Sequence, residues 1–197
     1  MPKIVDVPQK RAEIMEQAAR VFAAKGYSDA TLLDVARQCG MGRTSLYQYF
    51  ANKEELFTFL LDHVLRSLLA DMHEAAASSE HAYAKLQQVF TRLGRRFRTE
   101  KHLLMAVAEA KPVVKEGNEH IWQTIVSFRQ EAVQVLTSIL EEGAAHDQLV
   151  AVDGPSMAAT LYLLVESLVI HLAVTEESTL EQHLANLDFF LARLQRS

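Results

Sequence analysis

The amino-acid sequence predicts an all-α fold of about nine helices. Apolar residues recur at intervals of three and four along most of the chain, which is the spacing of one helix face. No alternating strand pattern, internal repeat or low-complexity tract is found, and the seven glycines and four prolines fall mostly between the periodic segments. With 197 residues, 49% hydrophobic and 23% charged, the chain has the composition of a soluble globular protein with a sizeable core.

The first two helices are bounded by residues with clear start and stop preferences. One helix is predicted between Pro8 and Gly26, because glycine adopts the left-handed conformation that ends helices. The second begins at Thr31, whose hydroxyl can accept from exposed backbone N–H groups, with Asp34 favouring the same helix end. It ends at residues 39–40. The inward-facing residues of the two helices are Ile14, Ala18, Val21, Phe22, Leu32, Val35 and Ala36.

A third helix is predicted over residues 43–50, where Leu46 and Phe50 lie four apart and share a face. Two short helices joined by a glycine-bearing turn indicate a helix-turn-helix. Residues 52–55, Asn-Lys-Glu-Glu, are similar to a capping box and open a long helix. The apolar stripe of that long helix consists of Leu56, Leu60, Val64, Leu68 and Met72.

Two more helices are expected after a small, polar break at residues 75–79. The first covers 83–97, and a shorter one covers 103–110. The shorter helix is predicted to stop before Pro112, because proline disfavours helical geometry in the residue that precedes it.

Two long helices follow. Asn118 is expected to cap the first, which ends near Gly143 and is followed by a loop. Pro155 starts the second, because proline is favourable in a first helical turn. Residues 160–174 of this helix are apolar nearly all round, so the helix must be covered on more than one side.

The last helix is predicted to start with a capping box formed by Ser178 and Glu181. Two adjacent apolar helices that meet their two-fold copy would form a four-helix packing, which buries faces that one chain cannot cover. We therefore expect the last two helices to form a homodimer interface. The interface residues predicted from them are Leu161, Leu164, Leu168, Leu184, Leu187 and Leu191.

Residues 31–56 read "TLLDVARQCGMGRTSLYQYFANKEEL", and together with upstream positions this segment resembles the DNA-binding signature of TetR-family transcriptional regulators. The similarity covers about a quarter of the chain. The matching positions are Ala18, Phe22, Gly26, Tyr27, Thr31, Val35, Ala36, Gly40, Leu46, Tyr47, Tyr49, Phe50, Lys53, Glu54 and Leu56. The resemblance implies a ligand-responsive homodimeric repressor, with a three-helix DNA-binding domain at 1–53 and a helical effector-binding and dimerisation domain at 54–197.

The resemblance also implies which residues contact DNA. The corresponding positions are Thr31, Arg43, Ser45, Tyr47, Tyr49 and Lys53. We expect Arg43 and Ser45 at base edges, and we add Gln48 because its amide can pair with adenine. The others are expected at phosphates.

Three residues of this segment bear on how it would meet DNA. Lys53 lies in the first turn of its helix, where the helix dipole disfavours a cation, and this favours an anionic partner. Two positions depart from the family pattern. Gly42 stands where the family often has a Ser or Thr cap, and Thr44 stands where glycine is frequent.

The charge distribution agrees with DNA binding by one end of the chain. The net charge is −5, which alone would disfavour nucleic acid. Residues 1–53, however, carry eight Lys and Arg against five acids, and the remainder therefore carries a net −8. Because phosphate binding depends on local charge, only the N-terminal part is expected to meet double-stranded DNA, at a pseudo-palindromic operator.

Aromatic and ionisable residues of the later helices suggest a site for a small, mostly apolar effector. Phe90, Phe97, Met105, Trp122, Phe128 and Tyr162 either line such a site or form a plain core. Glu166 and His171 lie in the apolar helix, where an ionisable group needs a partner, a ligand or a water-filled cavity. Both are included as candidate ligand contacts.

Several other chemistries are disfavoured. The single cysteine, Cys39, excludes an internal disulfide and a Cys-based zinc cluster, and the eight histidines form no tight metal-ligand motif. We therefore expect no metal and no cofactor. The arginines at 92, 95, 96 and 98 are interpreted as a solvated face that pairs with acids such as Glu100 or Asp71.

A cytoplasmic location is expected, because no apolar run reaches the roughly 18 residues of a membrane span and no signal peptide begins the chain. No catalytic motif emerges, so an enzyme is not expected. Two alternatives stay open: a helical enzyme that uses Glu166 and His171, and an adaptor whose last helices bind a different protein.

Overall fold

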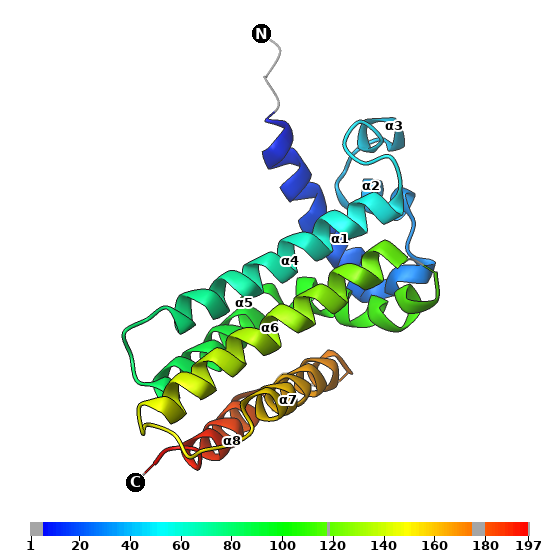
Figure 1. Cartoon of the computed structure of the whole chain (residues 1–197). Coiled ribbons are helices and arrows are strands. Elements are labelled where there is room, and N and C mark those ends of the chain that lie inside the picture. Colours follow the sequence, from blue (N-terminus) through cyan, green and yellow to red (C-terminus); the bar gives the residue numbers. More distant parts are fainter. Residues whose placement is uncertain (1–5, 118, 175–179, 197) are drawn as a thin grey trace. The chain divides into compact units, whose positions relative to one another are not determined.

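The computed structural model describes residues 6–117, 119–174 and 180–196, and within these ranges the chain is helical apart from its connections (Figure 1). The all-α prediction is confirmed. The eight helices are α1 (Val7–Asp29), α2 (Leu32–Gln38), α3 (Arg43–Leu46), α4 (Lys53–Ala76), α5 (Ala82–Gly117), α6 (Glu119–Ala145), α7 (Gly154–Val174) and α8 (Leu180–Ala192). The expected caps at Asn118 and Ser178 lie outside the described residues.

The chain divides into two compact units. Unit 1 contains the described residues up to Val64 together with His102–Trp122. Unit 2 contains Leu65–Lys101 and the described residues from Gln123 onward. Helices α4, α5 and α6 each contribute residues to both units.

Unit 1 is built around aromatic side chains from α1 and α4. Phe22 meets Phe57 edge to face, with ring centroids 5.5 Å apart, and both are fully buried. The helix-turn-helix adds Val35, Leu46 and Phe50 to the same buried set. Inward-facing residues of α1 and α2 therefore occupy the core positions that the helical spacing predicts.

The turns of unit 1 follow from local chemistry. Gly26 has φ 75° and breaks α1, as its predicted role as a helix stop requires, and one further turn follows it. Thr31 and Asp34 form a complete capping box at the start of α2. Gly42 precedes α3 and supplies no side-chain cap.

Helix α3 is shorter than the predicted 43–50. It ends at Leu46, and the next residues form a turn closed by backbone bonds from Gln48 to Ser45 and from Tyr49 to Leu46. These bonds span three residues, which is the tighter pattern common at helix ends. At the start of α4, Asn52 Oδ1 accepts from the Glu55 N–H at 2.7 Å, as the capping box predicts.

The prediction of two helices over 83–97 and 103–110 is corrected by α5, and this reduces the expected nine helices to eight among the described residues. The chain stays helical from Ala82 to Gly117, with non-helical angles at Glu100 (φ −127°, ψ 27°). The predicted stop before Pro112 is wrong, because proline disfavours helical geometry in its predecessor without forbidding it.

Unit 2 packs α5, α6, α7 and α8 around a second core. Gly94 allows α5 and α8 to approach closely, because a Cβ there would lie 2.5 Å from a methyl carbon of Leu184. Buried members of this core include Leu86, Leu136 and Ile139. The chain end is held by a single antiparallel bridge between Leu149 and Gln195.

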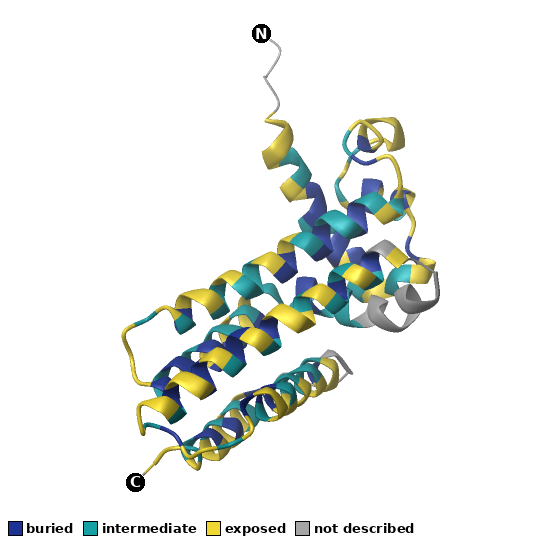
Figure 2. Cartoon of the chain, in the orientation of Figure 1, coloured by how far each residue is buried: buried dark blue, intermediate teal, exposed yellow. Residues whose placement is uncertain are grey.

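One face of α7 and α8 is left uncovered by the other described helices of unit 2 (Figure 2). Its large exposed side chains are Leu163, Leu164, Ile170, Phe189 and Phe190. The stretch Gly154–Leu172 has the length and composition of a membrane span, with 17% of it buried. The expectation that no apolar run reaches the length of a membrane span is therefore corrected. The polar residues within Gly154–Leu172 still leave its mean hydropathy in the range of a span.

Candidate functional site

Helix α3 and the turn that follows it present a cluster of polar side chains to solvent. Arg43, Ser45 and Gln48 are exposed, and Tyr47 retains 42% of its accessible surface. Arg43 Nη2 donates to the Tyr47 hydroxyl at 3.1 Å, and its Cζ lies 5.4 Å from the centroid of that ring. A guanidinium held against an aromatic ring loses less freedom when it binds a base edge or a phosphate.

No carboxylate neutralises this cluster among the residues that the structure describes. Arg43 forms no ion pair there, and its polar contact is the Tyr47 hydroxyl. The acid of the neighbouring helix, Asp34, is bound to Lys25 Nζ at 2.7 Å. The exposed surface of the turn is therefore suited to a polyanion.

Thr31 is already used by the helix cap. Its hydroxyl donates to Asp34 Oδ2 at 2.7 Å and accepts from the Asp34 N–H at 3.2 Å. Hydrogen bonds from Lys25 and then from Thr31 lower the pKa of Asp34 to about 2. A phosphate at Thr31 would therefore have to share the hydroxyl with a charged carboxylate.

Lys53 has an internal partner that sequence reasoning did not include. Its Nζ donates to the carbonyl oxygens of Tyr27 and Ser28 at 2.7 and 2.9 Å, and it lies 4.7 Å from the Tyr27 ring centroid. These carbonyls at the end of α1 attract a cation. The unfavourable position in the first turn of α4 is thus compensated within the chain, so it no longer indicates an anionic partner.

Tyr49 is half-buried, and its carbonyl oxygen accepts from Arg11 Nη1 at 2.9 Å. Arg11 was missed in the sequence reasoning. Its position in the sequence could have indicated a structural role. Arg11 lies three positions before Ile14 and seven before Ala18, on the buried side of α1. A charged residue in an apolar stripe requires a partner.

The predicted effector residues are divided between the units. Met105 and Trp122 belong to unit 1, and the others belong to unit 2. In unit 2, the Phe128 and Tyr162 rings lie 6.4 Å apart, and the Tyr162 hydroxyl donates to Glu166 at 3.2 Å. Burial, followed by the Glu166 charge, raises the pKa of Tyr162.

Other predicted effector residues have different surroundings. Phe97 is fully buried, and His171 is exposed with its ring 5.5 Å from that of His183. Phe90 borders a hollow of about 230 Å³ between α5 and α8, whose wall also includes Leu184 and Asp188. A larger polar hollow between α4 and α6, of about 500 Å³, contains none of the predicted residues and is lined by His73, Ala76, Ser127, Gln130, Glu131, Gln134, Val135 and Ser138.

The predicted interface leucines fall into two groups. Leu161, Leu187 and Leu191 are buried in the core of unit 2. Leu164 is 51% exposed, while Leu168 and Leu184 are half-buried. The buried group faces the chain's own helices because the spacing of a leucine stripe does not distinguish an internal core from a subunit interface.

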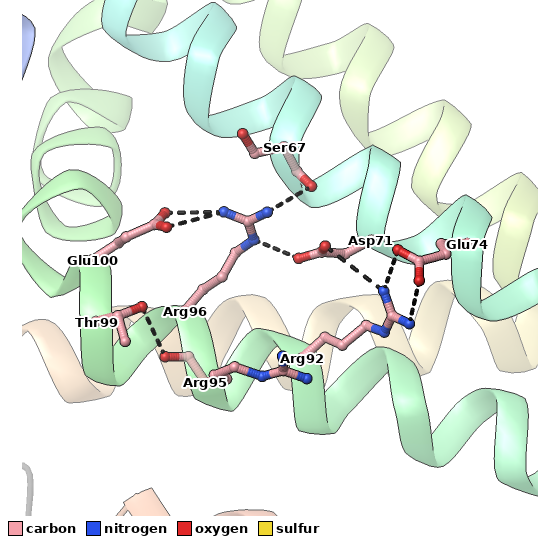
Figure 3. Close-up of polar contacts among 8 residues, drawn as sticks. All are labelled: Ser67, Asp71, Glu74, Arg92, Arg95, Arg96, Thr99 and Glu100. Atoms are coloured by element: carbon pink, nitrogen blue, oxygen red, sulfur yellow. Dashed lines mark hydrogen bonds and ion pairs between the residues drawn. The ribbon is translucent and has the colours of Figure 1, made fainter. Parts of the chain in front are cut away.

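Three of the four arginines of the α5 cluster, Arg92, Arg96 and Arg98, are paired with acids as predicted, and Arg92 and Arg96 are drawn in Figure 3. Arg95 is exposed and forms no ion pair among the described residues. Arg96 contacts Asp71 and Glu100, and its Nη2 donates to the Ser67 carbonyl oxygen at 3.3 Å. Arg92 forms a two-bond contact with Glu74 at 2.6 and 2.8 Å. Arg98 pairs with Glu181 at 2.6 Å. No group suited to a metal ion is found among the described residues.

Comparison with known proteins assigns residues 14–58 to the family described as "Bacterial regulatory proteins, tetR family". The chain is 31% identical over 80 residues to the HTH-type transcriptional regulator BetI of Brucella anthropi, which is 41% of each protein. It is 36% identical over 84 residues to the HTH-type transcriptional repressor KstR2 of Mycobacterium tuberculosis, 43% of this chain and 42% of that protein. The match thus spans about two fifths of these curated relatives.

Solved structures share the fold over nearly the whole chain. The TetR family transcriptional regulator PfmR from Thermus thermophilus superposes with a TM-score of 0.77 and 22% identity, covering 95% of this chain and 98% of that one. The fatty acid degradation regulator FadR from Bacillus halodurans gives a TM-score of 0.79 at 16% identity, covering 92% and 94%. At these identities the likeness shows the fold.

Proposed function

This chain belongs to the TetR family of bacterial regulatory proteins through its DNA-binding domain at residues 14–58, and from that premise we propose that it is a sequence-specific, ligand-responsive homodimeric repressor of the cytoplasm. The observation that carries the proposal is the exposed cluster of Arg43, Ser45, Tyr47 and Gln48, with no neutralising acid among the described residues. We assign DNA binding to 1–53 and effector binding and dimerisation to 54–197. The matched relatives are transcriptional regulators, and no catalytic activity is assigned.

The proposed DNA contacts follow from exposure and chemistry. Arg43 and Gln48 reach base edges, because their side chains form two parallel hydrogen bonds with guanine and adenine respectively. Ser45 also lies on the base-reading side. Tyr47 supports Arg43 and reaches phosphate. Thr31, Tyr49 and Lys53 are secondary phosphate contacts, because each already has an internal structural role.

The uncovered face of α7 and α8 supports homodimer formation. A second copy of the chain would cover Leu163, Leu164, Ile170, Phe189 and Phe190 with an identical apolar surface. Two subunits would then bind a pseudo-palindromic operator with half-sites about 34 to 36 Å apart, or a multiple of that distance. Mass measurement of the parent and of Phe190→Asp tests the assembly. A parent that stays monomeric at micromolar concentration would contradict it.

The effector is proposed to be a small, mostly apolar molecule that binds the helices after residue 53. Phe128 and Tyr162 form an aromatic contact there, and Glu166 supplies a polar group. An effector that prefers one conformation and an operator that prefers another must weaken each other's binding reciprocally. A compound that raises the melting temperature and weakens operator binding would support this regulation.

Selection of bound duplexes from a random DNA library tests DNA reading, with the purified protein at about 0.15 M salt. We expect one inverted repeat to be enriched by the parent and lost or relaxed with Arg43→Ala. Arg95→Ala is the matched control, because it removes an exposed arginine from α5. No enrichment by a folded dimer over a range of salt concentrations would overturn the proposal.

A further inference from the structure

Arg11 of α1 lies against two aromatic rings of unit 1, Phe50 and Phe59, whose centroids are 5.6 Å apart. Its Cζ lies 4.2 Å from the centroid of the Phe50 ring and 4.8 Å from that of Phe59. Phe50 is fully buried and directly follows the turn after α3, whereas Phe59 lies in the second turn of α4. The guanidinium therefore joins the first helix to the two segments on either side of the α3–α4 connection.

The same guanidinium also forms hydrogen bonds on both sides of the α3–α4 connection. Nη1 donates to the Tyr49 carbonyl oxygen at 2.9 Å, and Nη2 donates to Glu55 Oε1 at 3.1 Å. The other oxygen of Glu55 accepts from the Ala51 N–H at 2.7 Å. One cation and one carboxylate thus hold the backbone from Tyr49 to Glu55 in a single arrangement.

This arrangement matters because α3 cannot hold its own direction. It has only four residues, Arg43–Leu46, and a single helical turn is not stable by itself. Its orientation must come from packing and from the turn that follows it. Tyr47 and Gln48, two of the proposed DNA contacts, immediately precede the carbonyl that Arg11 holds.

We propose that Arg11 is a positioning residue for DNA reading, which sets the direction of α3 and of the turn after it without itself contacting DNA. The inference rests on the proposed function, because it assigns a role within that DNA-reading site. Arg11 differs from a phosphate contact in that both terminal nitrogens are engaged inside the protein. Lysine has a single ammonium in place of the two terminal nitrogens that make these bonds, so it is not an equivalent residue here.

Arg11→Met tests the proposal, because methionine keeps an apolar stem against Phe50 and Phe59 and removes the two hydrogen bonds. We expect affinity for the selected operator to fall about ten-fold or more, since a misdirected turn loses base contacts. Affinity for unrelated DNA should stay within about two-fold, and the slope of log K against log salt should not change, because no phosphate contact is lost. Arg11→Lys should behave similarly, because one ammonium cannot replace the two guanidinium nitrogens that bind Tyr49 and Glu55.

Lys10→Met is the matched control. It removes a cation from the adjacent position of α1, where the Lys10 ammonium pairs with Glu13 at 2.8 Å. Its operator affinity should stay near that of the parent. All affinities are measured well below the melting temperature and are calculated from the concentration of folded, active protein. A loss of stability is then not mistaken for a loss of binding.

Hydrogen exchange supplies a readout that does not depend on DNA. In Arg11→Met, the amides of Phe50 and Ala51 should exchange at least about ten-fold faster than in the parent, while buried α2 amides keep their rates. Unchanged exchange there would overturn the proposal even if no operator is found. A salt slope reduced by about one, with equal losses on all DNA, would show a phosphate contact instead and would also overturn it. A parent that binds no DNA would refute the proposed function alone.

Discussion

Two regions of the molecule carry arginines on helices, and the regions differ in whether carboxylates neutralise these arginines. In α5, Arg92 and Arg96 each meet a carboxylate (Figure 3). Arg98 meets Glu181, and Arg95 alone of the four arginines forms no ion pair among the described residues. In α3, Arg43 contacts the hydroxyl and ring of Tyr47 and forms no ion pair among the described residues. The denser arginine cluster is therefore the less available to DNA.

A count of basic residues therefore does not locate a polyanion site. The net charge of −5 hides a basic N-terminal part, and the α5 cluster suggests a basic patch that its acids neutralise. What matters for phosphate is whether a cation already has an anionic partner.

The largest effect is expected on DNA affinity. Arg43→Ala should weaken operator binding by about 1 to 3 kcal/mol, because a two-bond contact with a base edge is lost. Arg92→Ala should leave affinity unchanged within error, because Glu74 already neutralises the arginine that it removes. Fluorescence anisotropy with a labelled operator measures both variants. Equal losses in the two variants would remove the distinction between the two regions.

The second effect is on folding stability. Arg96→Met should lower the free energy of unfolding by about 1 to 3 kcal/mol, because it leaves the partly buried Asp71 with only the 4.0 Å contact to Arg92. Denaturant unfolding at neutral pH measures the change. A variant as stable as the parent would show that the ion pairs of α5 serve solubility alone.

A third effect depends on pH and concerns the cap of α2. The pKa of Asp34 is lowered from 3.8 to about 2, first by Lys25 and then by Thr31. Its contribution to stability is therefore present above about pH 4 and is lost as the pH falls toward 2.

The melting temperatures of the parent and Asp34→Asn should differ at about pH 5 and converge near pH 2. Thermal unfolding followed by circular dichroism at several pH values measures the difference. A gap that stays constant over this range would show that Asp34 acts through its shape and not its charge.

The smallest effect is expected from an exposed pair of the α5 region. The side chains of Arg98 and Glu181 are 48% and 72% exposed, so water screens their attraction. Arg98→Met should change the free energy of unfolding by less than about 1 kcal/mol. The same denaturant experiment that tests Arg96→Met measures it. A loss as large as that of Arg96→Met would mean that exposure does not rank these ion pairs.

Local chemistry accounts for most of what could be predicted from sequence. The capping box of Thr31 and Asp34, the break at Gly26 and the cap at Asn52 each depend on residues close in the chain, and all three are found. The helical spacing predicts buried positions such as Leu46 and Phe50 for the same reason.

Contacts between distant residues account for what could not be predicted. Helix α3 was expected to reach Phe50, but the Tyr49 carbonyl is held by Arg11, which lies 38 positions away. Lys53 was interpreted from the helix dipole of α4 alone, while its partners lie at the end of α1. Spacing also could not separate Leu187, which is buried in the chain's own core, from the exposed Leu164.

The makeup of unit 1 has a consequence for exchanging parts between related proteins. The unit includes His102–Trp122 as well as the N-terminal helices, and His102 Nε2 lies 2.7 Å from a Glu16 carboxylate oxygen. Leu103 and Ile121 of the same segment are fully buried. A chimera that joins residues 1–64 of this chain to a foreign effector domain would separate the N-terminal helices from side chains with which they fold. The portable piece is discontinuous in sequence, so a successful graft must carry two segments.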